Sequence, residues 1–179
     1  MYCTAESNTP TRIRRKRRLK KKKKRKRSIL IYNPCKALEF NKRDLQAAFH
    51  FLDQYAPYSI PDGDLSLALL ENEAHNQLHA DFLNDPTPTD VITFPGDPED
   101  KTAGEICVSI DTAYDYSTEN KADFSRELTL YLVHGWLHLA GFDDLEELDR
   151  KAMKKEERVC MSMLETNEKI PLFKYSKHD

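Results

Sequence analysis

Two histidines, His134 and His138, stand four residues apart in a short segment that also contains glycine and aspartate. Residues four apart on an α-helix project from the same face, so the two imidazoles can bind one cation together. Gly141 follows three residues later, where a helix commonly ends in a left-handed conformation, and such a turn brings Asp143 or Asp144 back towards the histidines. Two histidines and one carboxylate leave a fourth position for water, which is typical of a catalytic zinc site rather than a structural one.

The His-x3-His spacing also suits two hydrogen-bonded imidazoles packed within an apolar helix. The surroundings favour a metal, because residues 128–140 are apolar nearly all round and burying two polar rings side by side is costly unless something binds them. Gly135 occupies the position at which metzincin-like proteases have a glutamate that activates water, which argues against proteolysis. The cysteines are scattered without a CxxC pair, which argues against a cysteine zinc site and favours reduced thiols in the cytoplasm.

The charge of the chain is divided unequally between two parts. The 179 residues have a formal charge of −2, yet 14 of the 16 residues from Arg12 to Arg27 are Lys or Arg. Residues 29–179 hold 14 basic and 29 acidic residues, a formal charge of −15. Residues 1–28 have almost no apolar surface to bury, so we predict a disordered basic tail. Three interpretations of this tail stay open: an arm for nucleic acid, a solvated segment without function, and a translated leader before a true start near Ile29.

Residues 29–179 are predicted to form one α+β domain, a small mixed four-stranded sheet packed with helices. No apolar run approaches the ~20 residues of a membrane span, so we expect no membrane partner. Segments 91–94 and 106–110 are close enough to pair as antiparallel strands, and a central buried helix ending at Ala140 carries the two histidines. The other expected elements are strands at 29–32 and 65–70, helices from 41–44 to Leu52 and from Glu71 to about Phe82, one or two helices within 111–140, and a final helix with the apolar stripe Leu145, Leu148, Ala152, Val159 and Met163.

Three blocks of the sequence resemble the motifs of a known family. Residues 126–144 resemble the signature H-G-x-L-H-L-x-G-[YF]-D-H of the YbeY family, bacterial endoribonucleases of ribosomal RNA maturation. Residues 88–95 (PTDVITFP) and 104–109 (GEICVS) resemble that family's PTDVLSFP and GDIxIS, in the same order, within a similarity spanning residues 29–164. The resemblance implies a cytoplasmic, single-strand-specific endoribonuclease with one Zn²⁺ per chain. It also implies processing of the 3′ end of 16S ribosomal RNA and ribosome quality control, with ribosomal RNA and ribosomal proteins or the small subunit as partners.

Two positions depart from the family pattern. The third histidine of the signature falls on Asp144, so the resemblance implies the metal ligands His134, His138 and Asp144. A carboxylate in place of an imidazole makes the metal centre less positive and favours harder ions somewhat more. The family's arginine in the proposed RNA cleft falls on Leu83, which removes a cation that would hold a phosphate.

Four further residues are candidates for the cleft or for supporting the ligands. Asp143 aligns with the aspartate before the family's third histidine, which suggests a supporting group rather than a ligand. Arg126 precedes His134 by about two helical turns and faces either the cleft or a surface ion pair. Ser109 resembles a residue of the family's fourth strand, and His79 is a candidate phosphate contact in place of the missing arginine.

Three functions compete on this basis. The first is a metal-dependent endoribonuclease, in which either a metal-activated water or the ribose 2′-hydroxyl attacks the phosphate. The second is a non-catalytic ribosome-assembly or RNA-binding factor with a structural metal, which would tolerate the loss of the arginine at Leu83. The third is a metallohydrolase for peptides or small molecules, which Gly135 disfavours.

Overall fold

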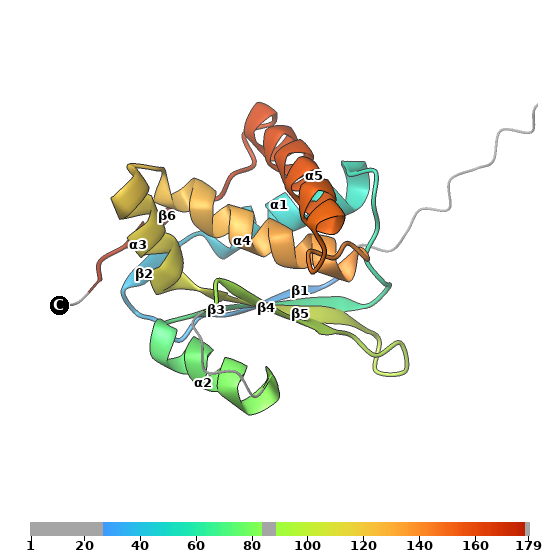
Figure 1. The fold of residues 1–179 in the computed structure, drawn as a ribbon, viewed down its shortest axis with the longest axis horizontal. Coiled ribbons are helices and arrows are strands. Elements are labelled where there is room, and N and C mark those ends of the chain that lie inside the picture. The colour runs from blue at the N-terminus through green and yellow to red at the C-terminus, as the bar shows by residue number, and fades with distance from the viewer. Residues whose placement is uncertain (1–26, 84–88, 178–179) are drawn as a thin grey trace, which may run out of the picture.

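The computed structural model describes residues 27–83 and 89–177, so the predicted basic tail lies outside the described residues except for its last two positions. Within these ranges the chain forms both helices and strands, as predicted, and their arrangement confirms the α+β class (Figure 1). In chain order the elements are β1 (Ile29–Tyr32), β2 (Leu38–Phe40), α1 (Lys42–Tyr55), β3 (Asp64–Leu70), α2 (Asn72–Leu83), β4 (Val91–Pro95), β5 (Thr102–Ser109), α3 (Ile110–Asn120), α4 (Phe124–Leu139), α5 (Glu147–Thr166) and β6 (Phe173–Tyr175).

The main sheet has the strand order β1-β3-β5-β4, with β1, β3 and β5 parallel and β4 antiparallel to β5. The prediction of a mixed four-stranded sheet is therefore confirmed, as is the antiparallel pairing of β4 with β5, in which Ile92 lies opposite Cys107. Strands β2 and β6 pair separately as a second, two-stranded sheet that the sequence did not predict. Each has three residues, and their partners are more than 130 residues apart, so no local pattern marks them.

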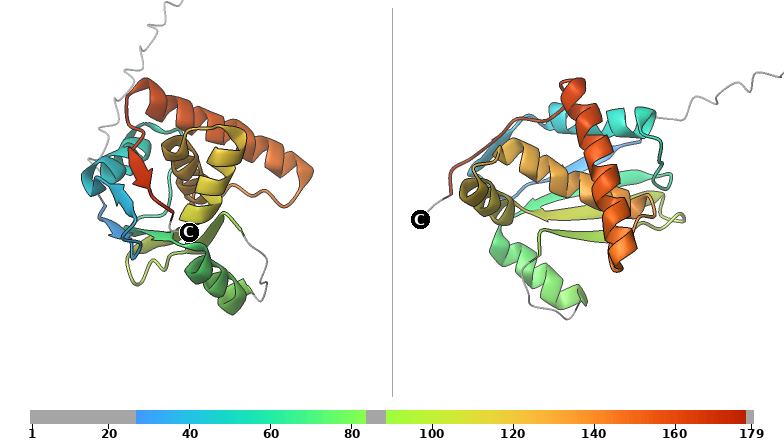
Figure 2. Two further views of the ribbon diagram at one scale, coloured as in Figure 1. Left: turned by 90° about the vertical axis from the view of Figure 1, so that its left-hand side faces the viewer. Right: turned by 45° about the horizontal axis from the view of Figure 1, so that its top comes forward.

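Helices cover both faces of the main sheet unequally. Figure 1 shows α1, α4 and α5 above the sheet and α2 below it, and both views of Figure 2 show α2 apart from the other helices. The main core lies on the α4 side and includes the fully buried Phe49, Leu67, Ile106 and Trp136. A smaller cluster around Ile92 lies on the other face of the sheet, between the strands and α2. The larger of the two cores therefore includes the helix that carries the two histidines.

Helix α4 packs closely on the sheet because Gly135 has no side chain. A Cβ at this position would lie 2.4 Å from Ile106 Cγ2 and 3.1 Å from Thr93 Oγ1, both on the strands beneath. The helix starts separately from α3, since Lys121 adopts a left-handed φ of 52° and the Asp123 side chain accepts a hydrogen bond from the Arg126 N–H. The region 111–140 thus holds two helices, and α4 is the central buried helix that was predicted.

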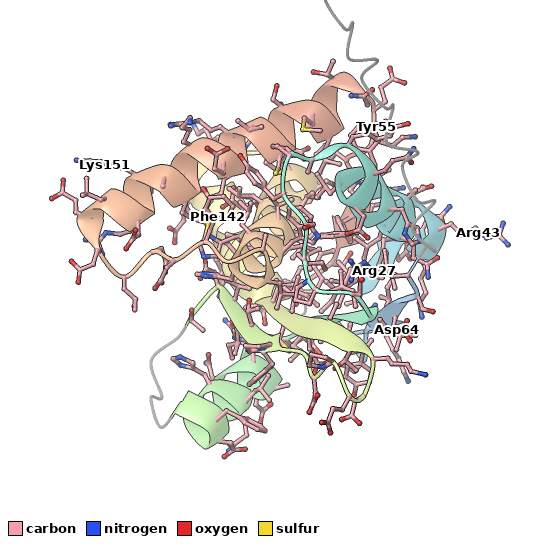
Figure 3. All side chains as sticks on the ribbon, turned by 90° about the vertical axis from the view of Figure 1, so that its right-hand side faces the viewer. Arg27, Arg43, Tyr55, Asp64, Phe142 and Lys151 are labelled. Atoms are coloured by element: carbon pink, nitrogen blue, oxygen red, sulfur yellow. The ribbon has the colours of Figure 1, made fainter. Side chains whose placement is uncertain are left out.

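The apolar stripe predicted for the last helix is wrong. Leu145 and Leu148 are 76% and 78% exposed, because α5 begins only at Glu147 and its first turns project beyond the body, as Lys151 shows in Figure 3. Further along the helix, Val159 is also partly exposed. The residues that α5 buries are Met153, Cys160, Met161 and Leu164.

The last residue of the basic run is bound to the folded domain. Arg27 Nε donates to Asp53 Oδ2 at 2.8 Å, and its Nη1 donates to the carbonyl oxygens of Pro61 at 2.8 Å and Gly63 at 3.0 Å. Arg27 therefore belongs structurally with the residues that follow it. Among the helices of the described residues, none is long and apolar enough to cross a membrane.

Candidate metal centre

His134 and His138 lie side by side near the end of α4. Their Nε2 atoms are 2.9 Å apart, and their rings meet edge to face with centroids 4.5 Å apart. Both side chains are only partly buried, so a ligand can reach them from solvent. The four-residue spacing thus places both imidazoles on one accessible face of the helix.

The second nitrogen of each ring is held by an acceptor. His134 Nδ1 donates to Glu157 Oε1 at 2.6 Å, and His138 Nδ1 donates to the carbonyl oxygen of Phe142 at 3.0 Å. A carboxylate and a carbonyl oxygen can only accept, so both Nδ1 atoms carry the proton. In the neutral imidazoles each Nε2 then presents a lone pair, and the two lone pairs converge on one point.

The turn after α4 brings a carboxylate to the same point. Gly141 has a φ of +93°, its N–H bonds the His138 carbonyl at 2.9 Å, and the next N–H, of Phe142, bonds the Leu137 carbonyl at 3.1 Å. This pair of hydrogen bonds is the Schellman motif that ends a helix on glycine. The reversed chain places Asp144 Oδ2 3.5 Å from His134 Nε2. The predicted left-handed helix end is therefore confirmed.

Asp143 stabilises this turn instead of facing the imidazoles. Its Oδ1 accepts hydrogen bonds from the backbone N–H groups of Asp144 at 2.7 Å and Leu145 at 3.3 Å. From α5, Arg150 donates to the carbonyl oxygens of the same two residues. The loop that contains Asp144 is thus stabilised by Asp143 within the loop and by Arg150 from α5.

The three groups have the chemistry of a cation site. Ligand atoms of His134, His138 and Asp144 all lie within 4.8 Å of one another. Two imidazole lone pairs and a carboxylate repel each other unless a proton or a metal ion lies between them. Burial lowers the pKa of His134, but the Glu157 hydrogen bond and the charges of Glu157, Asp90 and Asp144 raise it more, so this pKa lies above its ordinary value. The residues present therefore fit a divalent metal ion.

Glu157 is a residue of the candidate metal centre that sequence reasoning missed. It lies on α5, 23 residues after His134, in a run of acidic and basic residues that resembles any solvated helix face. Its orientation is set by the packing of α5 across α4, with the preceding Glu156 hydrogen-bonded to Tyr58 on the other flank. A carboxylate on the outer nitrogen of a metal-binding histidine fixes the ring and increases its basicity.

Replacing Glu157 with alanine is expected to weaken metal binding by about 10- to 100-fold, because the His134 ring loses the group that orients it. Competition with a chromophoric chelator measures the affinity. Glu165→Ala is the matched control, since Glu165 lies on the same helix and pairs with the exposed Arg126, away from the histidines. Equal affinities of the two variants would show that Glu157 does not support the metal site.

An open cleft adjoins His138. Its volume is about 410 Å³, and its walls include Leu139 at the end of α4, Ile92 and Thr93 on the edge strand β4, and Pro61 on the loop after α1. Of the three candidate ligands, His138 lines this cleft, so the cleft borders the candidate metal centre on that side.

The other predicted site residues lie elsewhere. Arg126 Nε pairs with Glu165 at 2.7 Å on the surface, which is the ion-pair alternative left open by the sequence. Ser109 is fully buried, accepts from the Thr112 N–H at the start of α3, and donates to the side chain of α2's first residue at 2.5 Å. His79 is buried on α2, across the sheet from α4. The structure does not bring these three residues to the histidine pair.

Comparison with known proteins identifies the family. Residues 31–165 match the family model described as Endoribonuclease YbeY, which is about three quarters of the chain. The chain belongs to the YbeY family. The matched region contains the two histidines, Asp144 and Glu157, whereas the basic run before residue 28 lies outside it.

Individual relatives agree with this placement. The chain is 51% identical over 85 residues to Endoribonuclease YbeY of Protochlamydia amoebophila, and the match covers 45% of this chain and 57% of that protein's length. It is 34% identical over 104 residues to Endoribonuclease YbeY of Carboxydothermus hydrogenoformans, covering 57% of this chain and 73% of the relative. A solution structure from Thermotoga maritima superposes with a TM-score of 0.57 at 27% identity, covering 78% of this chain and 90% of the other.

Proposed function

We propose that this YbeY family member is a metal-dependent endoribonuclease that acts on ribosomal RNA. The observation that supports this most is the convergence of two imidazole lone pairs and the Asp144 carboxylate beside an open cleft. The family relatives are named as endoribonucleases, which supports RNA as the substrate. From the resemblance of the motifs we further propose one zinc ion per chain, specificity for single strands, and cytoplasmic action on the 3′ end of the small-subunit RNA.

His134, His138 and Asp144 would hold the ion. When bound, zinc supplies Lewis-acid chemistry, which neutralises charge on a phosphate and lowers the pKa of water to about 7. Glu157 and the Phe142 carbonyl keep both Nδ1 protons outward, so the lone pairs of the two rings stay directed at the ion. The cleft beside His138 would orient the RNA strand. Gly135 supplies no proton acceptor, and the attacking group would be either a water molecule or the ribose 2′-hydroxyl.

A non-catalytic ribosome-assembly factor is the second candidate. Leu83 stands where the family carries an arginine, and residues 29–179 have a formal charge of −15, so the phosphate-binding charge of the family cleft is reduced. In that case the metal would stabilise the fold of the RNA-binding surface, and ribosomal proteins would supply part of the affinity.

Metal removal separates these functions. The purified full chain is expected to contain about one equivalent of metal and to cut single-stranded ribosomal RNA. Chelation should abolish cleavage, and added zinc should restore it, because the ion stabilises the charge that develops on the phosphate. Retained metal without cleavage by any added divalent ion would favour the assembly factor, whereas cleavage of casein but not of RNA would favour a peptidase.

A further inference from the structure

We propose that an exposed basic flank of α5 binds the backbone phosphates of the RNA strand that enters the metal centre. The basic flank consists of Lys151, Lys154, Lys155 and Arg158, all exposed to solvent. This inference rests on the proposed function, because it names the surface that would hold that substrate. The flank would also supply positive charge for phosphate binding, which the cleft lacks because Leu83 stands at the position of the family's arginine.

The four residues share one side of the helix. They occur at positions i, i+3, i+4 and i+7, the spacing that aligns side chains along a single face. Lys151 is paired with Glu147 at 2.6 Å. Lys154 and Arg158 make no hydrogen bond or ion pair with any residue that the structure describes. These two positions are about 6 Å apart along the helix axis, which is comparable to the separation of neighbouring phosphates on one nucleic acid strand.

The contacts of neighbouring residues determine where this flank points. Glu157 contacts the His134 ring, and Glu156 contacts Tyr58 on the side of α1. Successive helical residues are about 100° apart, so Arg158, one step beyond Glu157, faces away from Tyr58. Lys154, three residues before Glu157, neighbours it on the same helix surface. Both cations therefore lie beside the residue that supports the metal centre.

Acidic residues of α5 neutralise two members of this flank, since Lys151 pairs with Glu147 and Lys155 pairs with Glu156 at 3.2 Å. Lys154 and Arg158 are the two members that have no such partner among the described residues. Asp149 and Glu156 are seven residues apart, and both lie on the side of the helix opposite these two, towards Tyr58. The negatively charged ligand loop is partly covered from α5 by Arg150, which bonds the carbonyl oxygens of Asp144 and Leu145. A strand that follows α5 to the metal would thus pass along cations before it reaches Asp144.

Several other cations of the described domain are already engaged. Arg27 pairs with Asp53, Arg126 with Glu165, and Lys177 with Asp115. A phosphate backbone carries one negative charge per nucleotide and binds largely through Lys and Arg. In a domain with a net charge of −15, two unpaired cations beside the metal centre are suited to this contact.

The test is the double variant Lys154→Ala/Arg158→Ala in the full chain. The matched control is Lys42→Ala/Arg43→Ala, which removes the same two residue types from the exposed start of α1. Figure 3 shows Arg43 and Lys151 on opposite sides of the molecule. The probe is a short 2′-O-methylated single-stranded RNA, which cannot be cut through its 2′-hydroxyl, and binding is measured by fluorescence anisotropy at several salt concentrations.

The α5 variant is expected to bind the RNA about tenfold more weakly. A plot of the logarithm of its binding constant against the logarithm of the salt concentration should have a slope shallower by about 1.4, because each of the two lost phosphate contacts accounts for about 0.7. On a cleavable RNA its KM should rise with kcat unchanged, and its metal content should equal that of the unmodified chain. The control should bind within about twofold of the unmodified chain.

The outcomes distinguish this inference from the proposed function. Equal losses in the two variants, or no loss in either, would overturn the role of the basic flank even if the chain cuts RNA. An α5-specific loss of binding in a chain that cuts no RNA would refute the nuclease while supporting the flank as an RNA-binding surface.

Discussion

Replacing His138 with alanine is expected to abolish metal binding and to reduce RNA cleavage by at least about 1000-fold. The variant removes one of two converging Nε2 donors, and the remaining imidazole and carboxylate form an incomplete site. It should stay folded, because His138 is only partly buried and its Nδ1 contact is with a loop carbonyl. Metal content by mass spectrometry, cleavage of single-stranded RNA and circular dichroism together measure these three effects.

Substitutions of Asp144 provide the control for this result. Asp144→Ala should weaken metal binding by about tenfold or more, whereas Asp144→His should retain the metal, because histidine is an equally good zinc ligand. Asp143→Ala is the comparison for the loop, since its carboxylate caps two backbone N–H groups and does not face the imidazoles. Unchanged metal content in both His138→Ala and Asp144→Ala would refute the proposed centre.

Replacing Gly135 with alanine is expected to destabilise the fold by about 1–3 kcal/mol, the usual cost of overpacking a dense core. Alanine has the better intrinsic helix propensity, by about 1 kcal/mol, yet the new Cβ would lie 2.4 Å from Ile106 Cγ2. Denaturant unfolding followed by the fluorescence of Trp136, the single and fully buried tryptophan, measures the change. The same clash excludes a glutamate at this position, so the protease-type water activation is sterically blocked.

The double variant Gly135→Ala/Ile106→Ala tests this cause. Ile106→Ala removes the Cγ2 atom that the new methyl group would meet. The double variant should therefore lose less unfolding free energy than the two single variants added together, by about 1 kcal/mol. Strictly additive losses would show that Gly135 is needed for another reason.

Local sequence patterns accounted for most of the fold. Helix α1 begins at its expected cap, where the Asn41 side chain accepts from the Arg43 N–H, and its predicted apolar face is buried. The four main strands were recognisable because each is a compact apolar run bounded by turn residues. Strands β2 and β6 were missed because their pairing joins segments at opposite ends of the described domain.

The orientation of α5 shows the limit of local patterns. The leucines at 145 and 148 fitted a helical stripe, but they precede the part of α5 that crosses α4, so no neighbour covers them. The buried face is instead formed by methionine, cysteine and a later leucine among charged residues, a weaker periodic signal. The contacts of Glu157 with His134 and of Arg150 with the ligand loop follow from this crossing.

The sequence by itself determined that two imidazoles share one helix face and that a glycine turn returns a carboxylate towards them, because helix geometry and backbone sterics act over a few residues. The spacing alone left Asp143 and Asp144 open, and the resemblance to the family motif favoured Asp144, which the structure places near the imidazoles. Only the tertiary structure decided that Glu157 contacts the His134 ring and that Arg150 holds the ligand loop. Those contacts depend on how α5 packs across α4. Such packing is set by the burial of side chains distant in sequence, which no local pattern records.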